Sequence, residues 1–369
     1  MIELNEQNVI EYLRRREAIG PGRGLVKSLS GGVANVVLQI MEIEGGEPLG
    51  ADLRSENQKK CGVPDARMRR GNCFVIKQPL ARYKTAVSWL VDRDRVWTER
   101  DALTMLADIV PEGTLPRVLW SDEENYVLAI SAAAPGAVNW KTELLAGRLD
   151  ANAPEAAAAL LATIHSATAG QARWERRFGD ARGFIQQRID PYLRTTANKQ
   201  ESLRPALEKL ANFLLTEKHC LIHGDYSPKN MLICPLNNRP DGGLLLLDFE
   251  AAYYGHPVFD AATLLNHLLL KAFYSSRRWR AYMIAADTFW RSYRHRMRAE
   301  MRPQVQAMGG TMLGALMLAR LHGKSPVEYL TDPQLRSHIH KLAVQLIQPD
   351  AMTMDDALDM TGDFLGAAR

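Results

Sequence analysis

The sequence predicts an α+β fold with two lobes, a small β-rich lobe over residues 1–134 and a larger, mainly helical lobe over residues 135–369. Apolar runs of strand length, separated by polar or glycine-containing turns, are concentrated before residue 134. Longer apolar stretches with helical spacing predominate after it. A chain of 369 residues is long enough for two lobes with a sizeable core.

The composition indicates a globular protein and argues against several classes of partner. Hydrophobic residues make up 46% of the chain and charged residues 24%, and the net charge of +4 is too small to indicate nucleic-acid binding. No apolar run reaches the roughly twenty residues that cross a bilayer. The amino terminus lacks the features of a signal peptide, and the four cysteines form no metal-binding or redox pair. We therefore expect a cytoplasmic monomer or homodimer without membrane or nucleic-acid partners.

The N-terminal lobe is expected to begin with an amphipathic helix over residues 5–19, followed by two strands joined at Ser30-Gly31-Gly32. Glycines let backbone amides approach phosphate oxygens closely, so this turn is a candidate nucleotide-binding loop. Gly-Gly is also a common hairpin turn, and the loop is not the G-x-G-x-x-G of protein kinases. The polar residues 44–72 predict an exposed insertion before the next strand.

An apolar strand over residues 73–77 ends in Lys77, and a helix expected over residues 89–107 carries Glu99 on its apolar face. A lysine in a nucleotide cleft can reach the α and β phosphates when a carboxylate holds it. An unpaired carboxylate on an apolar face would be costly, so we predict an ion pair between Lys77 and Glu99. The alternative is that Glu99 pairs with Arg95 or with solvent.

The next strand, residues 126–130, leads into Ser131, Ala132 and Ala133 and then a Pro-Gly pair. Small residues followed by Pro-Gly suit a hinge between lobes, where backbone groups can bind the edge of an adenine ring. These three residues are therefore candidate nucleotide contacts.

Residues 221–250 contain the densest set of candidate functional side chains. Asp225 and Asn230, five positions apart, precede an apolar run of strand length. A turn-rich insert and a second such run follow, and Asp248 comes directly after the second run. Phosphoryl transfer needs one carboxylate to accept the proton of the attacking hydroxyl, and an amide and a second carboxylate to hold magnesium. Asp and Asn also commonly cap turns, but two strands and a second aspartate in this order favour the catalytic interpretation.

These motifs resemble those of the aminoglycoside phosphotransferase and choline kinase superfamily, which has a protein-kinase-like fold. Its catalytic loop usually reads His-Gly-Asp-x-x-x-x-Asn, as in residues 223–230 here, and its metal strand ends in Asp-Phe or Asp-Pro-Glu, similar to residues 248–250. The Ser-Gly-Gly loop also looks like one that is frequent in this superfamily. The resemblance spans nearly the whole chain in the order of its elements, but only the catalytic loop and the metal strand are highly specific.

The resemblance implies ATP- and Mg²⁺-dependent phosphorylation of a hydroxyl on a small molecule. Asp225 would then be the catalytic carboxylate, and Asn230 and Asp248 the magnesium ligands. Val33, Val75 and Leu232 would enclose the adenine. The full set of expected nucleotide-binding residues is Ser30, Gly31, Gly32, Val33, Val75, Lys77, Glu99, Ser131, Ala132, Ala133 and Leu232.

Local similarity and charge indicate the class of molecule that accepts the phosphoryl group. Residues 76–96 look like methylthioribose kinases, although Tyr226-Ser-Pro-Lys and Asp-Phe-Glu replace the usual His-Thr-Gly and Asp-Pro-Glu of those enzymes. Residues 271–302, in a region that forms much of the acceptor pocket in this superfamily, contain nine Lys or Arg against two acidic residues. This balance favours a neutral or anionic sugar or polyol over a polycationic aminoglycoside.

Three other classes of protein are alternatives to this interpretation. An aminoglycoside or other amino-alcohol kinase would share every catalytic residue and stays open as the alternative. A protein kinase would need an activation loop after Asp248, for which the chain leaves little room before Asp260. A non-catalytic nucleotide-binding scaffold would be expected to lack Lys77, Asp225, Asn230 or Asp248, and all four are present.

Two further polar residues are expected to have structural roles. Asp260 precedes an apolar helix and can be its N-cap, whereas the family resemblance implies that it braces the backbone of the catalytic loop. His165 lies in a nearly all-apolar helix beginning at Pro154, so we predict a packed core histidine and not a metal ligand.

Overall fold

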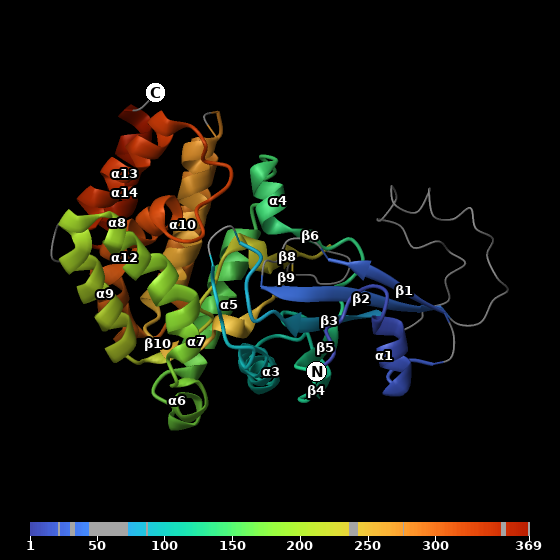
Figure 1. Cartoon of the computed structure of the whole chain (residues 1–369). Helices are drawn as coiled ribbons and strands as arrows, with labels where there is room; N and C mark the ends of the chain where they lie inside the picture. The colour runs from blue at the N-terminus through green and yellow to red at the C-terminus, as the bar shows by residue number, and fades with distance from the viewer. Residues whose placement is uncertain are drawn as a thin grey trace. The chain divides into compact units, whose positions relative to one another are not determined.

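The computed structural model describes residues 1–20, 23–29, 34–43, 73–85, 88–235, 243–275, 277–347 and 352–367. The chain forms two compact units, which are considered separately (Figure 1). Unit 1 comprises Met1–Thr104 and Pro116–Ala137, and unit 2 comprises Met105–Leu115 and Val138–Arg369. The Ser30-Gly31-Gly32 turn with Val33, the insertion at 44–72 and the turn at 236–242 lie outside the described residues.

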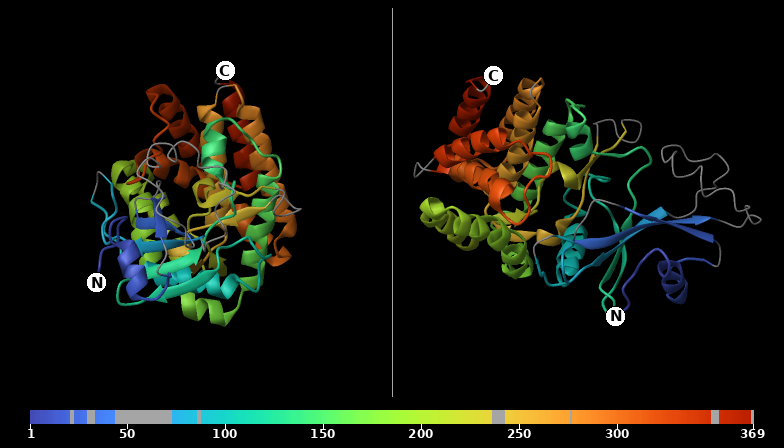
Figure 2. Two further views of the ribbon diagram at one scale, coloured as in Figure 1. Left: turned by 90° about the vertical axis from the view of Figure 1, so that its right-hand side faces the viewer. Right: turned by 45° about the horizontal axis from the view of Figure 1, so that its top comes forward.

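Unit 1 is built on a five-stranded antiparallel sheet with the order β1-β2-β3-β5-β4. Its strands are β1 (Arg23–Ser28), β2 (Asn35–Ile43), β3 (Cys73–Pro79), β4 (Val118–Asp122) and β5 (Val127–Ser131), and its helices are α1 (Val9–Arg15) and α3 (Arg95–Leu106). Apolar side chains of α1, including Val9 and Leu13, form one buried cluster with Ile40 and Ile76 of the sheet. The helix therefore covers one face of the sheet, as Figure 2 shows.

The second helix of unit 1 begins later than the sequence predicts. Helix α3 starts at Arg95 and not near Trp89, because the residues before it pair with an earlier segment. Leu90 forms an isolated β-bridge with Arg82, and the amide of Tyr83 donates to the carbonyl of Trp89 at 2.9 Å. The ring of Trp89 packs against Tyr83 with centroids 4.8 Å apart. Tertiary pairing thus overrides the helical spacing of this segment.

Unit 2 is mainly helical and contains two small antiparallel sheets, β6-β8-β9 and β10-β7. The strands are β6 (Val138–Asn139), β7 (Cys220–Ile222), β8 (Met231–Ile233), β9 (Leu244–Leu246) and β10 (Tyr253–Gly255). The α-helices are α4 (Trp140–Leu145), α5 (Ala153–Thr168), α6 (Ala172–Phe178), α7 (Arg182–Phe184), α8 (Thr195–Lys199), α9 (Arg204–Thr216), α10 (Val258–Tyr274), α11 (Trp279–Arg296), α12 (Arg302–His322), α13 (Pro333–Ile347) and α14 (Met354–Ala367). A π-helix, η1, spans Ile185–Arg194.

The core of unit 2 forms around α10 and α12, which pack against each other and against α11 and α13 respectively (Figure 1). An apolar stripe over residues 313–319 is buried in α12. Gly314 in this stripe allows close packing, because a Cβ there would lie 2.8 Å from the carbonyl oxygen of Ala343 in α13. Within the described residues, no helix is both long and apolar enough to cross a membrane.

Candidate active site

The loop after β7 places Asp225 and Asn230 in unit 2. Gly224 adopts a left-handed conformation with φ +75°, and a Cβ at this position would lie 2.2 Å from the carbonyl oxygen of Ala251. Glycine is therefore required for the chain to turn here. A single 3₁₀ turn, η3 (Pro228–Asn230), then leads into β8. The predicted hairpin is present, because β8 and β9 pair antiparallel.

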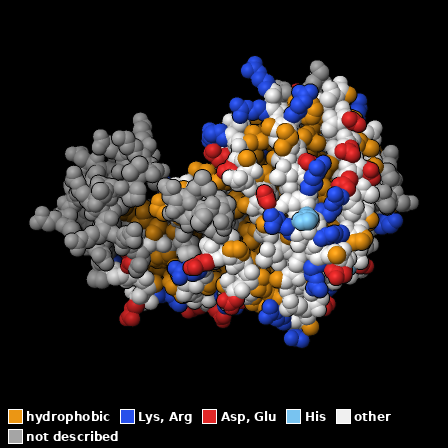
Figure 3. Space-filling model, turned by 180° about the vertical axis from the view of Figure 1, so that it is seen from behind, with side chains coloured by type: hydrophobic (Ala, Val, Ile, Leu, Met, Phe, Trp, Pro, Cys, Tyr) orange, Lys and Arg blue, Asp and Glu red, His pale blue; other side chains and the backbone are white. Residues whose placement is uncertain are grey.

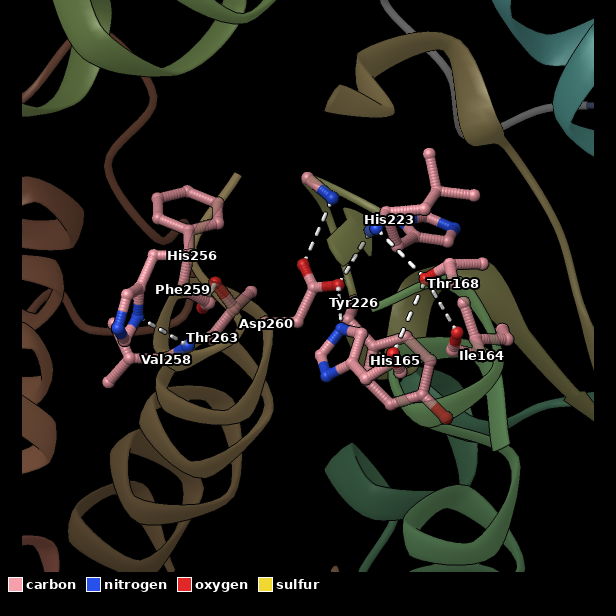
Figure 4. A network of polar contacts seen from close by, with 12 residues as sticks. Ile164, His165, Thr168, His223, Tyr226, His256, Val258, Phe259, Asp260 and Thr263 are labelled. Carbon is pink, nitrogen blue, oxygen red and sulfur yellow. Dashed lines mark hydrogen bonds and ion pairs between the residues drawn. The ribbon is translucent and has the colours of Figure 1, made fainter. Parts of the chain in front are cut away.

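Asp260 braces the backbone of this loop. Its carboxylate accepts hydrogen bonds from the amides of His223 at 2.6 Å and Gly224 at 2.9 Å. Figure 4 shows this carboxylate aimed from α10 at the loop. The brace implied by the family resemblance is thus present, but the N-cap interpretation is wrong. Asp260 lies in the first turn of α10, whose N-cap position is Pro257.

His165 supports Asp260 from the opposite helix and is fully buried in α5. Its Nε2 lies 3.2 Å from Asp260 Oδ2, and its Nδ1 lies 2.7 Å from the hydroxyl of Tyr293 (Figure 4). Both ring nitrogens therefore have partners within the core. This confirms the prediction of a packed histidine, and it adds a role in orienting the carboxylate of Asp260.

His223 ties the loop to the strand that precedes Asp248. The amide of Asp225 donates to His223 Nδ1 at 3.1 Å, so the proton of a neutral ring is on Nε2, which lies 2.9 Å from the carbonyl oxygen of Leu247. Burial lowers the pKa of His223, which favours this neutral form. The amide of Leu247 in turn donates to the carbonyl of Asn230 at 2.8 Å. The segments that carry Asp225, Asn230 and Asp248 are therefore held together by backbone hydrogen bonds.

Asp225 is a buried carboxylate, 5% exposed, that is held by two cations. Lys229 Nζ and Arg188 Nη2 lie 2.7 and 3.0 Å from the same oxygen, Oδ2. Burial alone would raise the pKa of Asp225, but the Lys229 ammonium and the Arg188 guanidinium outweigh it and hold the pKa well below its usual range. The carboxylate is therefore ionised at neutral pH.

Asn230 and Asp248 are oxygen donors of the kind that Mg²⁺ requires. The side-chain amide nitrogen of Asn230 donates to the carbonyl of Asp225 at 3.0 Å, which fixes the side chain. Asp248 is half-buried and has φ +73°, a conformation that side chains rarely adopt. This left-handed residue turns the chain sharply after β9 into the turn η5 (Phe249–Ala251). The two side chains fit a divalent cation that is completed by phosphate oxygens.

Lys77 and Glu99 lie in unit 1 and form the ion pair that the sequence predicts. Lys77 Nζ lies 2.7 and 2.6 Å from the two carboxylate oxygens of Glu99, and the two residues are only 7% and 2% exposed. Arg95, the alternative partner, donates to the carbonyls of Ala34 and Leu80 and lies over the ring of Tyr83. The pair is bidentate and buried, so the lysine is held in one position.

The other predicted nucleotide contacts lie at strand ends or within strands of each unit. In unit 1, Val75 is buried in β3 opposite Ile130. Ser131 ends β5, where its Oγ accepts from the amide of Arg117 at 2.9 Å, and half-buried Ala132 and Ala133 follow without regular structure. In unit 2, Leu232 is half-buried in β8 opposite Leu245.

Comparison with known proteins decides the family. The model of the Phosphotransferase enzyme family (APH) matches residues 73–303, which is more than half of the chain and includes Lys77, Asp225, Asn230 and Asp248. The chain belongs to this phosphotransferase family. The match contains the braced loop, the hairpin and the Lys77–Glu99 pair. A search of curated proteins found no match.

Solved structures share the fold of this phosphotransferase across nearly its whole length. Amicoumacin kinase hAmiN in complex with AMP-PNP, Ca²⁺ and Ami is 12% identical, with 95% of each chain covered and a TM-score of 0.53. A mutant of aminoglycoside 2′-phosphotransferase-IIIa with GDP is 15% identical, with 98% of this chain and 97% of that chain covered and a TM-score of 0.51. Ethanolamine kinase of Plasmodium vivax is 10% identical, with 100% and 89% covered and a TM-score of 0.51. At these identities the likeness establishes the kinase-like fold of the family.

Two residues of this phosphotransferase that contact Asp225 were not singled out in the sequence. Arg188 lies in η1, far from the motifs, and its Nε also donates to the carbonyl of Gly224. A basic residue in a helical, charged segment gives no local signal of such a contact. Lys229 had a weak signal, since it directly precedes Asn230 and lies four positions after Asp225.

Proposed function

We propose that the protein transfers the γ-phosphoryl group of ATP, with Mg²⁺, to a hydroxyl of a small molecule, a sugar or polyol. The observation that carries this proposal is the ionised, buried Asp225, held between Arg188 and Lys229 and braced next to Asn230 and Asp248. Such a carboxylate orients a hydroxyl and receives its proton as the new P–O bond forms. The two units correspond to a nucleotide-binding lobe and a catalytic lobe.

Each remaining residue has a stated role in this proposal. Asn230 Oδ1 and the carboxylate of Asp248 would hold Mg²⁺, which would neutralise phosphate charge. Lys77, fixed by Glu99, binds phosphate oxygens. The proposed adenine contacts are Val75 and the backbone of Ser131, Ala132 and Ala133 in unit 1 and Leu232 in unit 2. Val33 and the turn Ser30-Gly31-Gly32, which the sequence also predicts to contact the nucleotide, lie outside the described residues. The cations beside Asp225 lower its basicity, so it acts chiefly by orienting the hydroxyl.

The sugar or polyol assignment rests on charge. Several arginines among residues 271–302 pair with carboxylates: Arg291 with Asp287, Arg294 with Asp355, Arg296 with Glu155 and Arg298 with Glu300. Basic and acidic side chains are also interspersed on the face of the molecule in Figure 3. Only those basic residues that lack an acidic partner therefore bear on the charge of the acceptor. Among the residues that the structure describes, Lys271 lacks an acidic partner, and its charge disfavours a polycationic acceptor.

An acceptor screen tests the proposal. Purified protein is supplied with MgATP, and ADP release is followed with methylthioribose, simple sugars and polyols, kanamycin-type aminoglycosides, choline and ethanolamine. We expect release with a sugar or polyol and none with the aminoglycosides. Efficient phosphorylation of aminoglycosides or amino alcohols, with no sugar or polyol accepted, would contradict the substrate assignment. ADP release that does not depend on any acceptor would contradict phosphoryl transfer to a hydroxyl.

A further inference from the structure

Lys271 in α10 is a buried cation without an acidic partner among the described residues. It is 1% exposed, and its Nζ donates to the carbonyl of His267, one turn earlier on the same helix, at 3.1 Å. Burial, followed by the nearby charges of Lys141 and Arg320, lowers its pKa to about 7, although Glu328 acts in the opposite direction. A buried ammonium normally requires a carboxylate or several hydrogen-bond acceptors, and one carbonyl leaves it poorly compensated.

The groups around Lys271 also have unused hydrogen-bond donors. Arg320 in α12 contacts Ser325 Oγ at 3.1 Å, but its buried Nε has no acceptor in the described part of the chain. The buried hydroxyl of Tyr329 likewise has no partner there, and the ring of Tyr329 lies 5.4 Å from Lys271 Nζ. The carboxylate of Glu328 is exposed and is already paired with Lys141 at 2.5 Å. We call Lys141, Lys271, Arg320 and Tyr329 the Lys271 cluster.

A short chain of contacts connects this cluster to the candidate catalytic carboxylate. Arg320 Nη1 lies 3.4 Å from the hydroxyl of Tyr192 in η1, and its Cζ lies 5.9 Å from the centre of the Tyr192 ring. Arg188 Cζ lies 5.5 Å from the same ring, and Arg188 pairs with Asp225. The guanidinium that holds Asp225 and the guanidinium of the cluster therefore both lie near the Tyr192 ring. Asp225 and Arg320 are linked within unit 2 through Arg188 and Tyr192.

The position of His267 supports the same arrangement. Burial lowers the pKa of His267, and the charges of Lys271 and Arg320 lower it further, whereas Asp225 acts in the opposite direction. The pKa of His267 is thus influenced by charges of the cluster and by the Asp225 carboxylate. Both groups belong to unit 2, and they are held by α10, α12, η1 and the loop after β7.

We propose that the Lys271 cluster binds an anionic group, a carboxylate or a phosphate, of the molecule whose hydroxyl is phosphorylated at Asp225. This inference rests on the proposed function and narrows it to hydroxy acids or sugar phosphates. An oxyanion offers several acceptor atoms, so it can bind Arg320 Nε and the hydroxyl of Tyr329 while its charge compensates Lys271. Arg320 and Tyr329 are partly exposed as residues, but these two donor atoms are buried, so an anion reaches them only when the side chains turn toward solvent.

Binding is measured first, without nucleotide, so that turnover is not required. Thermal shifts are recorded at constant ionic strength with gluconate against sorbitol and with ribose 5-phosphate against ribose. We expect at least one of the two anions to raise the Tm well above the effect of its neutral counterpart, and the responding anion distinguishes carboxylate from phosphate. If neither anion stabilises the protein more than its neutral partner, the proposal is overturned.

Variants assign any stabilisation to the cluster. Lys271→Met keeps the length of the side chain and removes the charge, and Arg320→Gln is a second variant at a partly exposed position. Each should weaken the apparent affinity for the anion about tenfold or more. Arg291→Gln, on the exposed surface of α11, is the matched control and should bind as the unmodified protein does. Undiminished anion binding in both cluster variants would contradict the proposal.

Kinetics separate this inference from the proposed function. Anion binding that depends on Lys271, without ADP release for any acceptor, would retain the anion site and refute the kinase assignment. ADP release with sorbitol or ribose that is at least as efficient as with gluconate or ribose 5-phosphate would retain the kinase and refute the anion site. With an anionic substrate, Lys271→Met should raise KM about tenfold with a smaller change in kcat, since the cluster binds a non-reacting group.

Discussion

Two buried lysines, one in each unit, have opposite electrostatic surroundings. Lys77 in β3 is bonded to both oxygens of Glu99, which is itself 2% exposed. Among the described residues, Lys271 in α10 donates to one carbonyl, and the nearby charges of Lys141 and Arg320 outweigh that of Glu328. Burial is similar at 7% and 1%, so burial alone does not distinguish them. The two lysines differ in their partners. The charge of Lys77 is neutralised by Glu99 within the fold, whereas in our proposal the charge of Lys271 is compensated when an anion binds.

The comparison shows how one residue type can serve two kinds of site. A lysine that is fixed by a carboxylate keeps its charge and position before the ligand arrives, which suits contact with a phosphate that must be aligned. A lysine without a partner destabilises the empty protein and recovers that free energy when an anion binds. The predictions below test this difference in order of decreasing effect.

Breaking the Lys77 pair should have the largest effect on stability. Lys77→Met leaves Glu99 as a buried carboxylate without its cation, so the free energy of unfolding should fall by about 3 kcal/mol or more. The double variant Lys77→Met/Glu99→Leu removes both charges and should recover most of the loss. Urea unfolding of the three proteins measures this. Equal stability of the single and double variants would show that the pair does not hold the fold in this way.

Stabilisation by MgATP should depend on Lys77 and not on Lys271. Excess MgATP at about one hundred times its Kd should stabilise the unmodified protein by about 2.7 kcal/mol. Asp248→Ala and Lys77→Met should lose this stabilisation, because they remove the proposed magnesium ligand and the proposed phosphate contact, and Lys271→Met should keep it. His165→Ala is the control for general damage, since it should lower the Tm and still respond to MgATP. A full MgATP response in Asp248→Ala would contradict the metal assignment.

Removing the charge of Lys271 should stabilise the empty protein. Lys271→Met replaces a poorly compensated ammonium with an apolar chain of similar volume, which should raise the free energy of unfolding by about 2 kcal/mol. Arg291→Gln on the surface should change it by less than about 0.5 kcal/mol. Chemical unfolding without ligands measures both. A loss of stability in Lys271→Met would mean that the lysine is already well compensated in the fold.

The advantage of Lys271→Met should shrink as the pH rises. The pKa of Lys271 is lowered to about 7 by burial and by Lys141 and Arg320, against Glu328, while the unfolded chain keeps a value near 10.5. The penalty is therefore complete below about pH 7 and fades as the pH rises toward 10.5. Between these two values the penalty falls by roughly 1.4 kcal/mol per pH unit, so the difference between the two proteins should be clearly smaller at pH 9 than at pH 6. A difference that does not change between pH 6 and pH 9 would contradict the lowered pKa.

The sequence predicted the parts of the site that local chemistry specifies. The spacing of Asp225 and Asn230, the hairpin that leads to Asp248, and the carboxylate on the apolar face of α3 can all be recognised within short segments. The strands near residues 73–77 and 126–130 and the N-terminal helix were predicted as well. The short strands β4, β6, β7 and β10 were not singled out, and α3 starts later than expected. There, the bridge between Arg82 and Leu90 replaces the first turns of the expected helix.

Contacts between distant segments could not be predicted in the same way. Arg188 precedes Asp225 by 37 positions in a helical segment without a motif, and only the folded π-helix brings it to the carboxylate. The charge of residues 271–302 was visible, but the pairing of individual arginines with Glu155 or Asp355 depends on tertiary packing. The electrostatic surroundings of Lys271 likewise depend on tertiary packing, because Lys271, Arg320 and Lys141 lie on the separate helices α10, α12 and α4.

Transfer of the γ-phosphoryl group from labelled ATP, compared between the unmodified protein and Asp225→Asn, tests the central claim most directly. The substrate is whichever hydroxy compound gives the highest rate in the screen, and MgATP binding is measured in parallel by thermal shift. Asp225→Asn keeps the shape of the side chain but loses the charge that orients the hydroxyl. It should retain MgATP binding and lose transfer by about a hundredfold or more. Near-normal transfer by the variant would contradict the assignment of Asp225 and the mechanism built on it.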